Sequence, residues 1–367
     1  MRSISLYVHV PFCRRRCPYC TFYHVALGDG MRERSLVDAL LNEFEFVSRE
    51  IGDAFSVPTV YIGGGTPSAI GFDELRRILE PVVPRLDRAG AEITVEMNPE
   101  DVDESVLAEA ALAGVNRVSL GVQSMSRRAQ EILGRCPPEI NRGALELVSD
   151  RFDNFNADIL AGIPGASAGE IEATIAAVCE YGPSHYSVYC LEPGGDIDSP
   201  AAGFFGNVDP DRSAAEYLEA CAALEARGYA HYEVSNFARP GRECAHNLVY
   251  WEGAEYIGIG PGAHSFVGSE RYRNLASVDR YIARSREYPQ GIRRRDRRGA
   301  GEKALERIML GLRTSAGVPL SMVAAPPEAV EEIRAEGLAL VGGGRIRLTD
   351  RGFLVLNEII HRLNRPV

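Results

Sequence analysis

The three cysteines closest to the N-terminus could together do chemistry that single side chains cannot. Cys13, Cys17 and Cys20 lie in the segment Cys13-Arg14-Arg15-Arg16-Cys17-Pro18-Tyr19-Cys20. A structural zinc site favours four ligands in paired cysteine knuckles, and no second close pair of cysteines follows. Three thiolates can hold a [4Fe–4S] cluster and leave one iron without a protein ligand. We therefore predict a [4Fe–4S] cluster whose open iron can bind a substrate.

Further unusual residues follow short β-branched runs in the sequence. The glycine run Gly63-Gly64-Gly65-Thr66-Pro67 ends the second run, and Glu96, Gln123 and Asp158 lie at the next three. A phosphate-binding loop would add a lysine and open a helix, so this run is more typical of backbone that approaches an amino-acid group. In a barrel of parallel strands, residues at the carboxyl ends of the strands meet on one face. We expect these residues to meet the cysteines there.

The elements that must position these residues are six repeats of a strand followed by a helix. Apolar and β-branched runs predict strands over Ser5–Val10, Thr59–Ile62, Glu92–Glu96, Arg117–Val122, Asn156–Ile163 and His185–Leu191. Amphipathic patterns predict helices over Arg32–Glu50, Phe72–Leu86, Glu104–Ala113, Glu139–Ser149 and Ala168–Tyr181. Right-handed crossovers then give a parallel sheet, either doubly wound or curled into part of a barrel. The positions of the unusual residues favour an α/β fold with a partial, TIM-like (β/α)6 barrel.

Beyond this barrel the sequence becomes polar and then changes pattern. The arginine-rich stretch Arg284–Arg298 is interpreted as a solvated linker. After it, a helix over Glu302–Arg313, a hairpin turning at Gly342–Gly344 and a closing helix over Phe353–Leu363 predict a small C-terminal α+β, winged-helix-like domain. The closing helix has an apolar pattern suited to docking, so we do not expect it to read DNA.

Composition and charge exclude several classes of function. The chain has 367 residues, of which 45% are hydrophobic, and carries a net charge of −11. This length suffices for one large domain and one smaller domain, and the charge disfavours binding to nucleic acid. No apolar run approaches the roughly 20 residues of a membrane span, and residues 1–10 lack the pattern of a signal peptide. We expect a cytoplasmic protein that acts on small molecules.

The remaining cysteines are scattered along the sequence. Because the cytosol keeps thiols reduced, the eight cysteines do not predict a disulfide framework. The five outside the N-terminal group are interpreted as packing or surface thiols: Cys136, Cys179, Cys190, Cys221 and Cys244.

The C-x₃-C-x₂-C spacing after the first strand resembles the signature of the radical SAM superfamily. In that superfamily the open iron chelates the amino and carboxylate groups of S-adenosylmethionine (SAM), and the cluster supplies the electron that cleaves it. Arg135 matches a carboxylate clamp, a role that suits a bidentate guanidinium. The resemblance implies that SAM is bound by residues that match family positions, namely Tyr7, Tyr19, Gly64, Gly65, Thr66, Glu96, Gln123, Arg135 and Asp158.

Nearly the whole chain also resembles the family that contains oxygen-independent coproporphyrinogen III dehydrogenase (HemN) and its haem-chaperone relative (HemW). The dehydrogenase pattern has a fourth cysteine where this chain has Phe22, and a long extension where this chain has twelve residues before Cys13. The segment His246-Asn247-Leu248-Val249-Tyr250-Trp251 matches the HNxxYW motif of the chaperone branch. The resemblance divides the chain into a radical SAM core barrel over 1–230, a connecting region over 231–300 and a C-terminal domain over 301–367.

The HNxxYW motif is associated with haem binding in that branch, which implies haem contacts from His246, Tyr250 and Trp251. Imidazole is a common axial ligand of haem iron, and aromatic rings can stack on a porphyrin. The same residues could instead form an internal hydrogen bond and a piece of core. Rival axial ligands that the sequence does not rank are His9, His185 and His264.

These resemblances give two main hypotheses for the function. The first is a haem carrier that delivers haem to haemoproteins of the respiratory membrane, with the cluster and SAM serving assembly or transfer. The alternative is a coproporphyrinogen III dehydrogenase that forms protoporphyrinogen IX; a methylating or porphyrin-opening radical SAM enzyme is a third. Enzymatic activity is left open, and dehydrogenase activity is not expected.

The resemblance also implies partners and a location. The expected partners are haem, haem-accepting membrane proteins and a low-potential electron donor, with a homodimer formed on cluster assembly. The protein would act in the cytoplasm and lie at the inner membrane during haem delivery.

Overall fold

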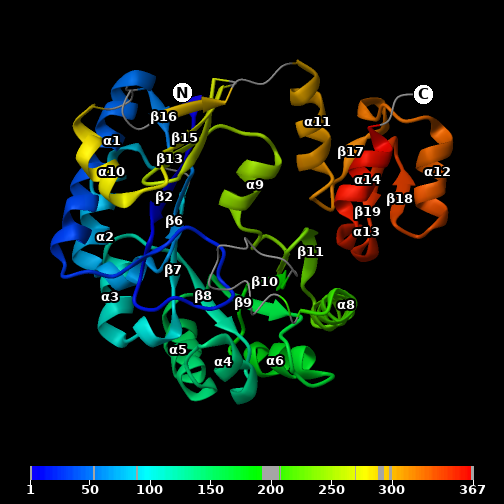
Figure 1. The fold of residues 1–367 in the computed structure, drawn as a ribbon, viewed down its shortest axis with the longest axis horizontal. Coiled ribbons are helices and arrows are strands. Elements are labelled where there is room, and N and C mark those ends of the chain that lie inside the picture. Colours follow the sequence, from blue (N-terminus) through cyan, green and yellow to red (C-terminus); the bar gives the residue numbers. More distant parts are fainter. Residues whose placement is uncertain are drawn as a thin grey trace.

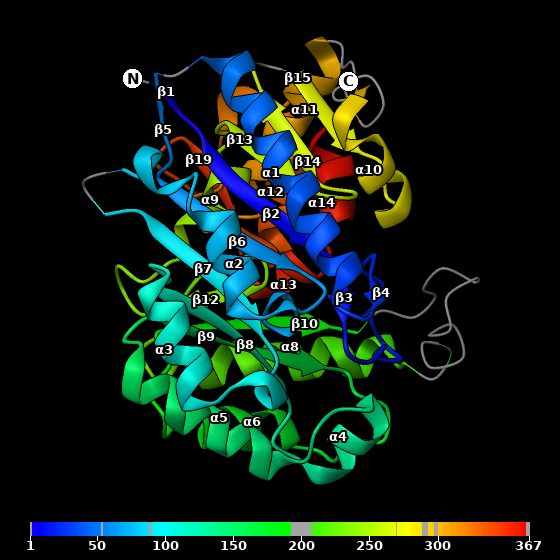
Figure 2. The same cartoon turned by 90° about the vertical axis from the view of Figure 1, so that its left-hand side faces the viewer.

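Six parallel strands form the centre of the computed structural model, which describes residues 2–52, 54–87, 90–191, 206, 208–268, 270–287, 293–296 and 300–364. In spatial order these strands are β2, β6, β7, β8, β9 and β10, and every neighbouring pair is parallel. The sheet curls as a partial barrel (Figures 1 and 2), which confirms the predicted fold class. The bounds of the strands are Ser5–Val10, Thr59–Gly64, Glu92–Met97, Arg117–Gln123, Phe155–Ala161 and His185–Cys190.

Helices cover the outer face of the curled sheet (Figure 2). In β2, the alternate residues Leu6, Val8 and Val10 are buried in the main hydrophobic core, whereas Tyr7 and His9 line a cavity on the opposite side. This alternation follows from the two-residue period of a strand. The covering helices are α1 (Met31–Ile51), α2 (Phe72–Leu79), α3 (Glu104–Leu112), α4 (Arg127–Leu133), α5 (Pro138–Arg151), α6 (Glu170–Cys179) and α8 (Pro210–Glu225).

Helix α2 is shorter than the amphipathic pattern predicts. The pattern extends to Leu86, but α2 ends at Leu79 and a separate 3-10 turn follows at Val83–Arg85. Pro81 and Pro84 account for the break, because proline lacks the amide hydrogen that continues a helix.

Short strands extend the sheet at both edges. On one side β13 (Tyr256–Ile259) pairs in parallel with β2, and β14 (His264–Val267), β15 (Glu270–Asn274) and β16 (Arg293–Asp296) follow in antiparallel order. On the other side β12 (Asn236–Ala238) pairs with β10, and β11 (Ala230–Glu233) pairs with β12. Helix α10 (Val278–Arg284) lies between β15 and β16 in the sequence.

Part of the arginine-rich stretch is a strand, so its interpretation as a solvated linker is wrong there. The Arg293 side chain is only 7% exposed and pairs with Glu50 at 3.0 Å. Its guanidinium carbon lies 3.8 Å from the centre of the Tyr272 ring. An arginine can cover an aromatic ring with its planar head while its charge is paired, which lets a charged residue join a sheet edge. Residues 288–292 and 297–299 of this stretch lie outside the described residues.

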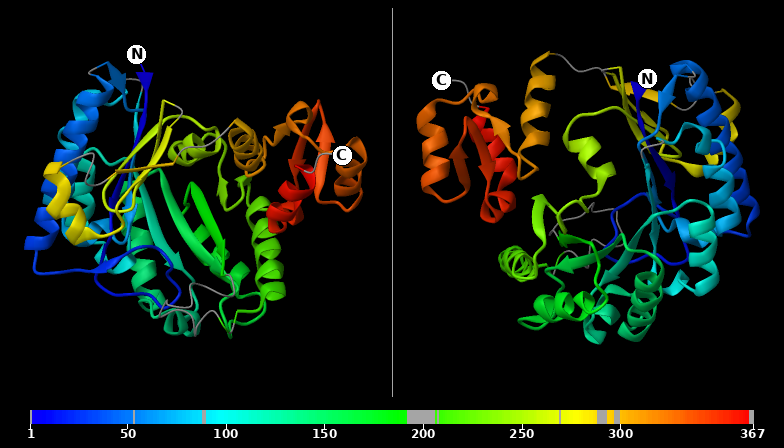
Figure 3. Two further views of the ribbon diagram at one scale, coloured as in Figure 1. Left: turned by 45° about the horizontal axis from the view of Figure 1, so that its top comes forward. Right: turned by 180° about the vertical axis from the view of Figure 1, so that it is seen from behind.

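The C-terminal residues form a second, smaller body beside the barrel (Figure 3). Its antiparallel sheet has the order β17 (Val318–Pro319), β19 (Arg345–Leu348) and β18 (Ala339–Gly342). The helices packed with it are α11 (Ala300–Gly311), α12 (Pro327–Ala335), α13 (Asp350–Leu354) and α14 (Leu356–Leu363). A separate core, which includes Ile308, Ile333, Ile346 and Ile359, holds these elements together.

The closing helix divides in two, although the sequence pattern predicts one helix from Phe353. The Thr349 side chain accepts a hydrogen bond from the Gly352 amide and starts α13 early, and Val355 then leaves the helical conformation. Helix α14 buries Leu356, Ile359 and Leu363, so it docks as its pattern predicts. In the described part of the chain, no helix has both the length and the hydropathy to cross a membrane.

Candidate functional site

The cysteine loop is tied down at both ends. β3 (Phe12–Cys13) pairs with β4 (Val25–Ala26), and the Leu27 amide donates to the Cys13 carbonyl at 2.9 Å. Within the loop the Cys20 amide donates to the Cys17 carbonyl at 3.2 Å. These backbone bonds hold the three thiols over the carboxyl ends of the parallel strands.

Two arginines of the cysteine loop form ion pairs with the turn that follows β7. Arg14 pairs with Asp101 at 2.5 Å and Arg15 pairs with Glu100 at 3.1 Å. Both arginine side chains are more than half exposed, so each ion pair contributes little to stability alone. Their effect is to fix the direction of the loop that carries Cys13 and Cys17.

One cavity of about 510 Å³ collects the residues that the sequence singles out. It lies at the carboxyl ends of the strands, where chemistry is expected in a barrel of this kind. The three cysteines line it, together with the nine residues predicted to bind SAM: Tyr7, Tyr19, Gly64, Gly65, Thr66, Glu96, Gln123, Arg135 and Asp158. The structure therefore brings all of these together, although it does not assign a role to any of them.

The glycine run leaves no space for side chains. A Cβ on Gly63 would lie 2.8 Å from the Glu96 carboxylate, and one on Gly65 would lie 2.6 Å from the Phe12 carbonyl oxygen. Gly64 has φ +123°, a conformation that favours glycine. These glycines let β6 pass close to the backbone that leads into the cysteine loop.

Hydrogen-bond donors point at two of the three thiols. The Asn98 amide donates to Thr66 Oγ1 at 2.8 Å, and the Thr66 hydroxyl faces Cys13 Sγ at 3.6 Å. The Arg135 guanidinium lies 3.7 Å from Cys17 Sγ and also donates to the Gly121 carbonyl at 2.6 Å. Such donors stabilise sulfur that carries negative charge, as metal-bound thiolates do. Without metal, burial raises the pKa of the Cys13 thiol to about 11.

Two partly buried carboxylates line the same cavity. Glu96 accepts hydrogen bonds from Tyr61 Oη and from the Gly64 amide, both at 2.9 Å. Burial raises the pKa of Glu96 to about 7, and the negative charge of Asp158 adds to this rise. Burial also raises the pKa of Asp158, which accepts from Asn156 at 2.8 Å. When ionised, the pair favours a cationic ligand in the cavity.

Gln123 has an unusual backbone conformation. Among the described residues it is the one non-glycine residue with positive φ, at 67°. It follows an irregularity in the pairing of β8 with β9 between Leu120 and Gln123. Such strained residues concentrate at functional sites, and here the irregularity turns the Gln123 side chain into the cavity.

Sequence reasoning missed several lining residues. Ser119 and Tyr189 line the cavity, and neither was predicted to bind a ligand. Ser119 lies two and four residues before Gly121 and Gln123 on β8. Strict two-residue periodicity along each predicted strand would have found it.

Comparisons with known proteins agree with this geometry. Residues 7–178 match the family described as Radical SAM superfamily, and residues 300–355 match the family described as HemN C-terminal domain. Heme chaperone HemW from Mycobacterium tuberculosis is 36% identical, with 99% of this chain and 95% of that protein covered. The chain belongs to the HemW family of radical SAM proteins. A radical SAM domain implies a [4Fe–4S] cluster and SAM.

Other relatives extend the same conclusion. Heme chaperone HemW from Escherichia coli is 38% identical over 72% of this chain and 70% of that protein. Radical S-adenosyl methionine domain-containing protein 1, mitochondrial, from Bos taurus is 31% identical, with 97% of this chain and 86% of that protein covered. The solved structure of coproporphyrinogen III oxidase (HemN) from Escherichia coli has a TM-score of 0.85 at 22% identity, with 99% and 90% of the two chains covered. The HemW-family chain therefore shares this fold along its whole length.

The HNxxYW motif lies at the opposite end of the barrel from the cysteines. It forms α9 (Ala245–Trp251), which Figure 1 shows between the sheet and α11. The Glu92 carboxylate accepts from the amides of Ala245 and His246, each at 3.1 Å. The short helix thereby fills the end of the barrel at which the parallel strands begin.

The His246 ring is engaged on both nitrogens. Nδ1 lies 2.7 Å from Thr59 Oγ1 and Nε2 lies 2.8 Å from Tyr250 Oη. The ring is buried, and this burial lowers the pKa of His246 to about 3. In this conformation neither nitrogen is presented to a ligand, so the role of His246 as an axial haem ligand stays a prediction.

The rival histidines differ in position. His185 is buried with Nδ1 2.6 Å from Asn156 and Nε2 2.8 Å from Tyr232. His264 is exposed on β14, and His9 lines the main cavity. The structure thus leaves His9 as the one histidine of this group in the main cavity.

Trp251 lines a second cavity, which no predicted SAM residue enters. This cavity is about 410 Å³ and lies where α9 and β15 meet α11. Its lining combines the apolar surfaces of Trp251, Phe266 and Met322 with charged side chains of both signs, namely Arg271, Lys303, Arg307, Glu252 and Glu306. Glu306 pairs with Arg271 at 2.8 Å.

Replacing Gly65 tests the close approach of β6 to the cysteine loop. In Gly65→Ala the new Cβ would meet the Phe12 backbone, and we expect a loss of about 1–3 kcal/mol of stability, as for overpacked sites. Iron retention after reconstitution should fall as well, because the loop is displaced. Denaturant titration and iron analysis measure these effects.

The matched control is Gly143→Ala in helix α5, where the new Cβ would meet no atom within 4 Å apart from its chain neighbours and the nearby backbone of its own helix. This variant should gain up to about 1 kcal/mol. Equal behaviour of the two variants would contradict the role assigned to Gly65.

Proposed function

We propose that the chain is a haem chaperone, which binds haem and transfers it to haemoproteins of the respiratory chain. The observation that carries the proposal is the likeness to heme chaperones named HemW over nearly the whole chain. The cavity at Trp251 supports it, because Trp251 and Phe266 suit a planar apolar ligand, and Lys303 and Arg307 can pair with carboxylate groups.

In this proposal Cys13, Cys17 and Cys20 hold a [4Fe–4S] cluster. The three thiols share one cavity, and Thr66 and Arg135 offer hydrogen bonds to sulfur, so the residues fit the group. When bound, such a cluster supplies the electron for SAM cleavage in radical SAM proteins. The protein itself positions the ligand and excludes water from it.

The SAM contacts follow from the walls of the main cavity. Gly64, Gly65 and Thr66 would contact the methionine part of SAM, with Tyr7 and Tyr19 beside it. Arg135 would hold a carboxylate, and Asp158 would accept from the ribose. Glu96 and Gln123 would complete the polar wall.

Haem would bind at the Trp251 cavity. The Trp251 and Phe266 rings can stack on a porphyrin, and Lys303 and Arg307 can pair with its propionates. Met322 offers a thioether, a ligand type found on haem iron in cytochromes c. His246 and Tyr250 would not contact haem in this arrangement. They would hold α9, and with it Trp251, in place through the hydrogen bonds of the His246 ring.

Partners and organisation complete the proposal. Haem would pass to membrane haemoproteins while the protein is at the inner membrane, and a low-potential donor would reduce the cluster. The barrel over 1–230, the connecting region over 231–300 and the C-terminal domain over 301–367 would act together, with a homodimer formed on cluster assembly.

The second candidate function is that of a coproporphyrinogen III dehydrogenase. The shared fold with coproporphyrinogen III oxidase favours it. Against it, Phe22, which is 72% exposed at the rim of the main cavity, stands where the dehydrogenase pattern has a further cysteine.

One experiment separates the two candidates. Anaerobically reconstituted protein is titrated with haem, and in parallel is incubated with coproporphyrinogen III, SAM and a low-potential reductant. The chaperone proposal predicts a shifted Soret band that weakens in Trp251→Ala and persists in Trp251→Phe. Formation of protoporphyrinogen IX without any Soret shift would overturn it in favour of the dehydrogenase.

Replacing Cys17 tests the cluster. In Cys17→Ser the absorbance near ~400 nm and SAM cleavage should be lost, while the fold is kept because the thiol lies in a loop outside the main core. Cys179→Ser, on helix α6, is the matched control and should keep full iron and sulfide. Retention of the cluster in Cys17→Ser would refute the assignment.

Glu96 predicts a pH dependence of SAM binding. Because burial raises the pKa of Glu96 to about 7, the carboxyl becomes neutral as the pH falls through that value. Affinity for the cationic sulfonium should then fall about three- to tenfold between about pH 8 and about pH 6. Calorimetric titration of the reconstituted protein measures this change.

In Glu96→Gln the affinity should be low and nearly independent of pH, apart from the contribution of Asp158. The exposed Glu80→Gln on the outer surface should keep the wild-type profile. A pH dependence that survives in Glu96→Gln would rule out this carboxyl as the titrating group.

A further inference from the structure

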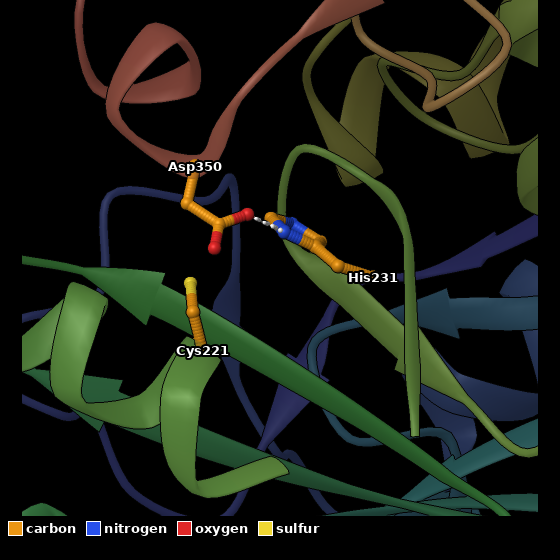
Figure 4. A group of neighbouring side chains, drawn as sticks. All are labelled: Cys221, His231 and Asp350. Carbon is orange, nitrogen blue, oxygen red and sulfur yellow. Dashed lines mark hydrogen bonds and ion pairs between the residues drawn. The ribbon is translucent and has the colours of Figure 1, made fainter. Parts of the chain in front are cut away.

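Three side chains of metal-binding type meet where the C-terminal body contacts the barrel. They are Cys221 on α8, His231 on β11 and Asp350 at the start of α13, and their ligand atoms all lie within 4.8 Å of one another. Figure 4 shows the three side chains converging from separate elements. Sequence analysis interpreted Cys221 as a packing thiol, and the proposed haem and SAM chemistry does not use this group.

The hydrogen bonds around His231 leave one nitrogen facing a carboxylate. Tyr217 Oη donates to the Val234 carbonyl at 2.7 Å, so its oxygen can accept from His231 Nε2, 3.3 Å away. His231 Nδ1 lies 2.7 Å from Asp350 Oδ1, and the tautomer of the ring decides whether it presents an N–H or a lone pair there. In the tautomer with hydrogen on Nε2, the Nδ1 lone pair and the Asp350 carboxylate face each other, and both can then bind one metal ion.

The geometry is held in advance of any ligand. The His231 ring stacks on Phe237 with centres 4.1 Å apart and contacts Phe353 at 4.9 Å. Tyr217 Oη contacts His231 Nε2 and so orients the ring. In metal sites, a hydrogen bond to the nitrogen that does not bind the metal orients a histidine ligand in the same way. The His231 side chain is 4% exposed and the Asp350 side chain 32% exposed, so an ion can enter from the side of Asp350.

We propose that Cys221, His231 and Asp350 form a binding site for a divalent transition-metal ion of the zinc class. Sulfur, imidazole nitrogen and carboxylate oxygen are the donors that zinc takes in proteins, at separations that small side-chain movements would reach. On binding, the Cys221 thiol releases its proton to solvent as the metal–sulfur bond forms, and any hydrogen on His231 Nδ1 moves to Nε2, where Tyr217 Oη accepts it. Thiolate and carboxylate together balance the charge of the ion, and a water molecule completes the fourth position.

Such a site would join the two bodies of the molecule. Cys221 and His231 belong to the barrel side, whereas Asp350 opens α13 of the C-terminal body. The bound ion would fix α13 against α8 and strengthen the junction on which that body sits. This inference does not depend on the proposed haem function.

The test uses full-length protein with its cluster reconstituted, so that the N-terminal cysteines are occupied. The protein is equilibrated with zinc chloride, passed through a desalting column and measured for zinc, iron and thermal unfolding. About one zinc per chain should be retained, with a higher unfolding temperature. X-ray absorption at the zinc edge should show one sulfur with nitrogen and oxygen neighbours.

Variants separate this site from other sources of zinc. Asp350→Asn keeps the size of a side chain that is about one third exposed, and it should weaken zinc binding at least about tenfold, as should Cys221→Ser. Tyr217→Phe should weaken it less, and Cys179→Ser should leave it unchanged. Iron content should stay the same in all four.

Three results would overturn the proposal. Zinc that is not retained would mean that the contact between His231 and Asp350 is a hydrogen bond alone. Zinc retained equally in Asp350→Asn and Cys221→Ser, or a zinc environment of three sulfurs, would place the ion elsewhere. Because Asp350→Asn removes no buried volume, its behaviour decides the matter even if Cys221→Ser fails to fold.

Discussion

A curled sheet buries alternate side chains on its concave side, and in this chain many of those side chains are polar. A buried polar group without a partner costs about 1–3 kcal/mol. Thr59 is buried and donates to Ser5 on the neighbouring strand, and both Thr59 and the partly buried Glu92 have further contacts outside the sheet. Helix α9 provides them through the His246 ring and the first amides of the helix. Helix α9 thus closes the end of the barrel at which the parallel strands begin. The cavity at the carboxyl ends of the strands stays open for a ligand.

Much of the barrel could be predicted because its strands and helices are separated by clear changes of period. The six parallel strands lie where β-branched runs predict them, and parallel topology then forces Gly64, Glu96, Gln123 and Asp158 toward one cavity. The roles of these residues came from resemblance alone, since neither spacing nor periodicity distinguishes a SAM ligand from another buried polar group.

Other features could not be predicted because they depend on contacts between distant segments. Arg293 joins a sheet edge only because Tyr272 and Glu50 cover its side chain, which composition cannot show. The same holds for His231 and Asp350, whose hydrogen bond spans 119 residues. The spacing of the HNxxYW residues in α9 identifies a motif. It does not show that the His246 ring points into the barrel, where both of its nitrogens have hydrogen-bond partners.

The pairing of β13 with β2 sets an order for folding. These strands are neighbours in the sheet although Ser5 and Tyr256, which lie opposite each other, are far apart in the chain. During synthesis one edge of β2 therefore stays open until most of the protein has emerged, and such an edge is a template for aggregation. A chain truncated before residue 256 would keep the cysteine loop but lose the strand that closes this edge. The segment before residue 256 is therefore not expected to behave as an independent iron–sulfur domain.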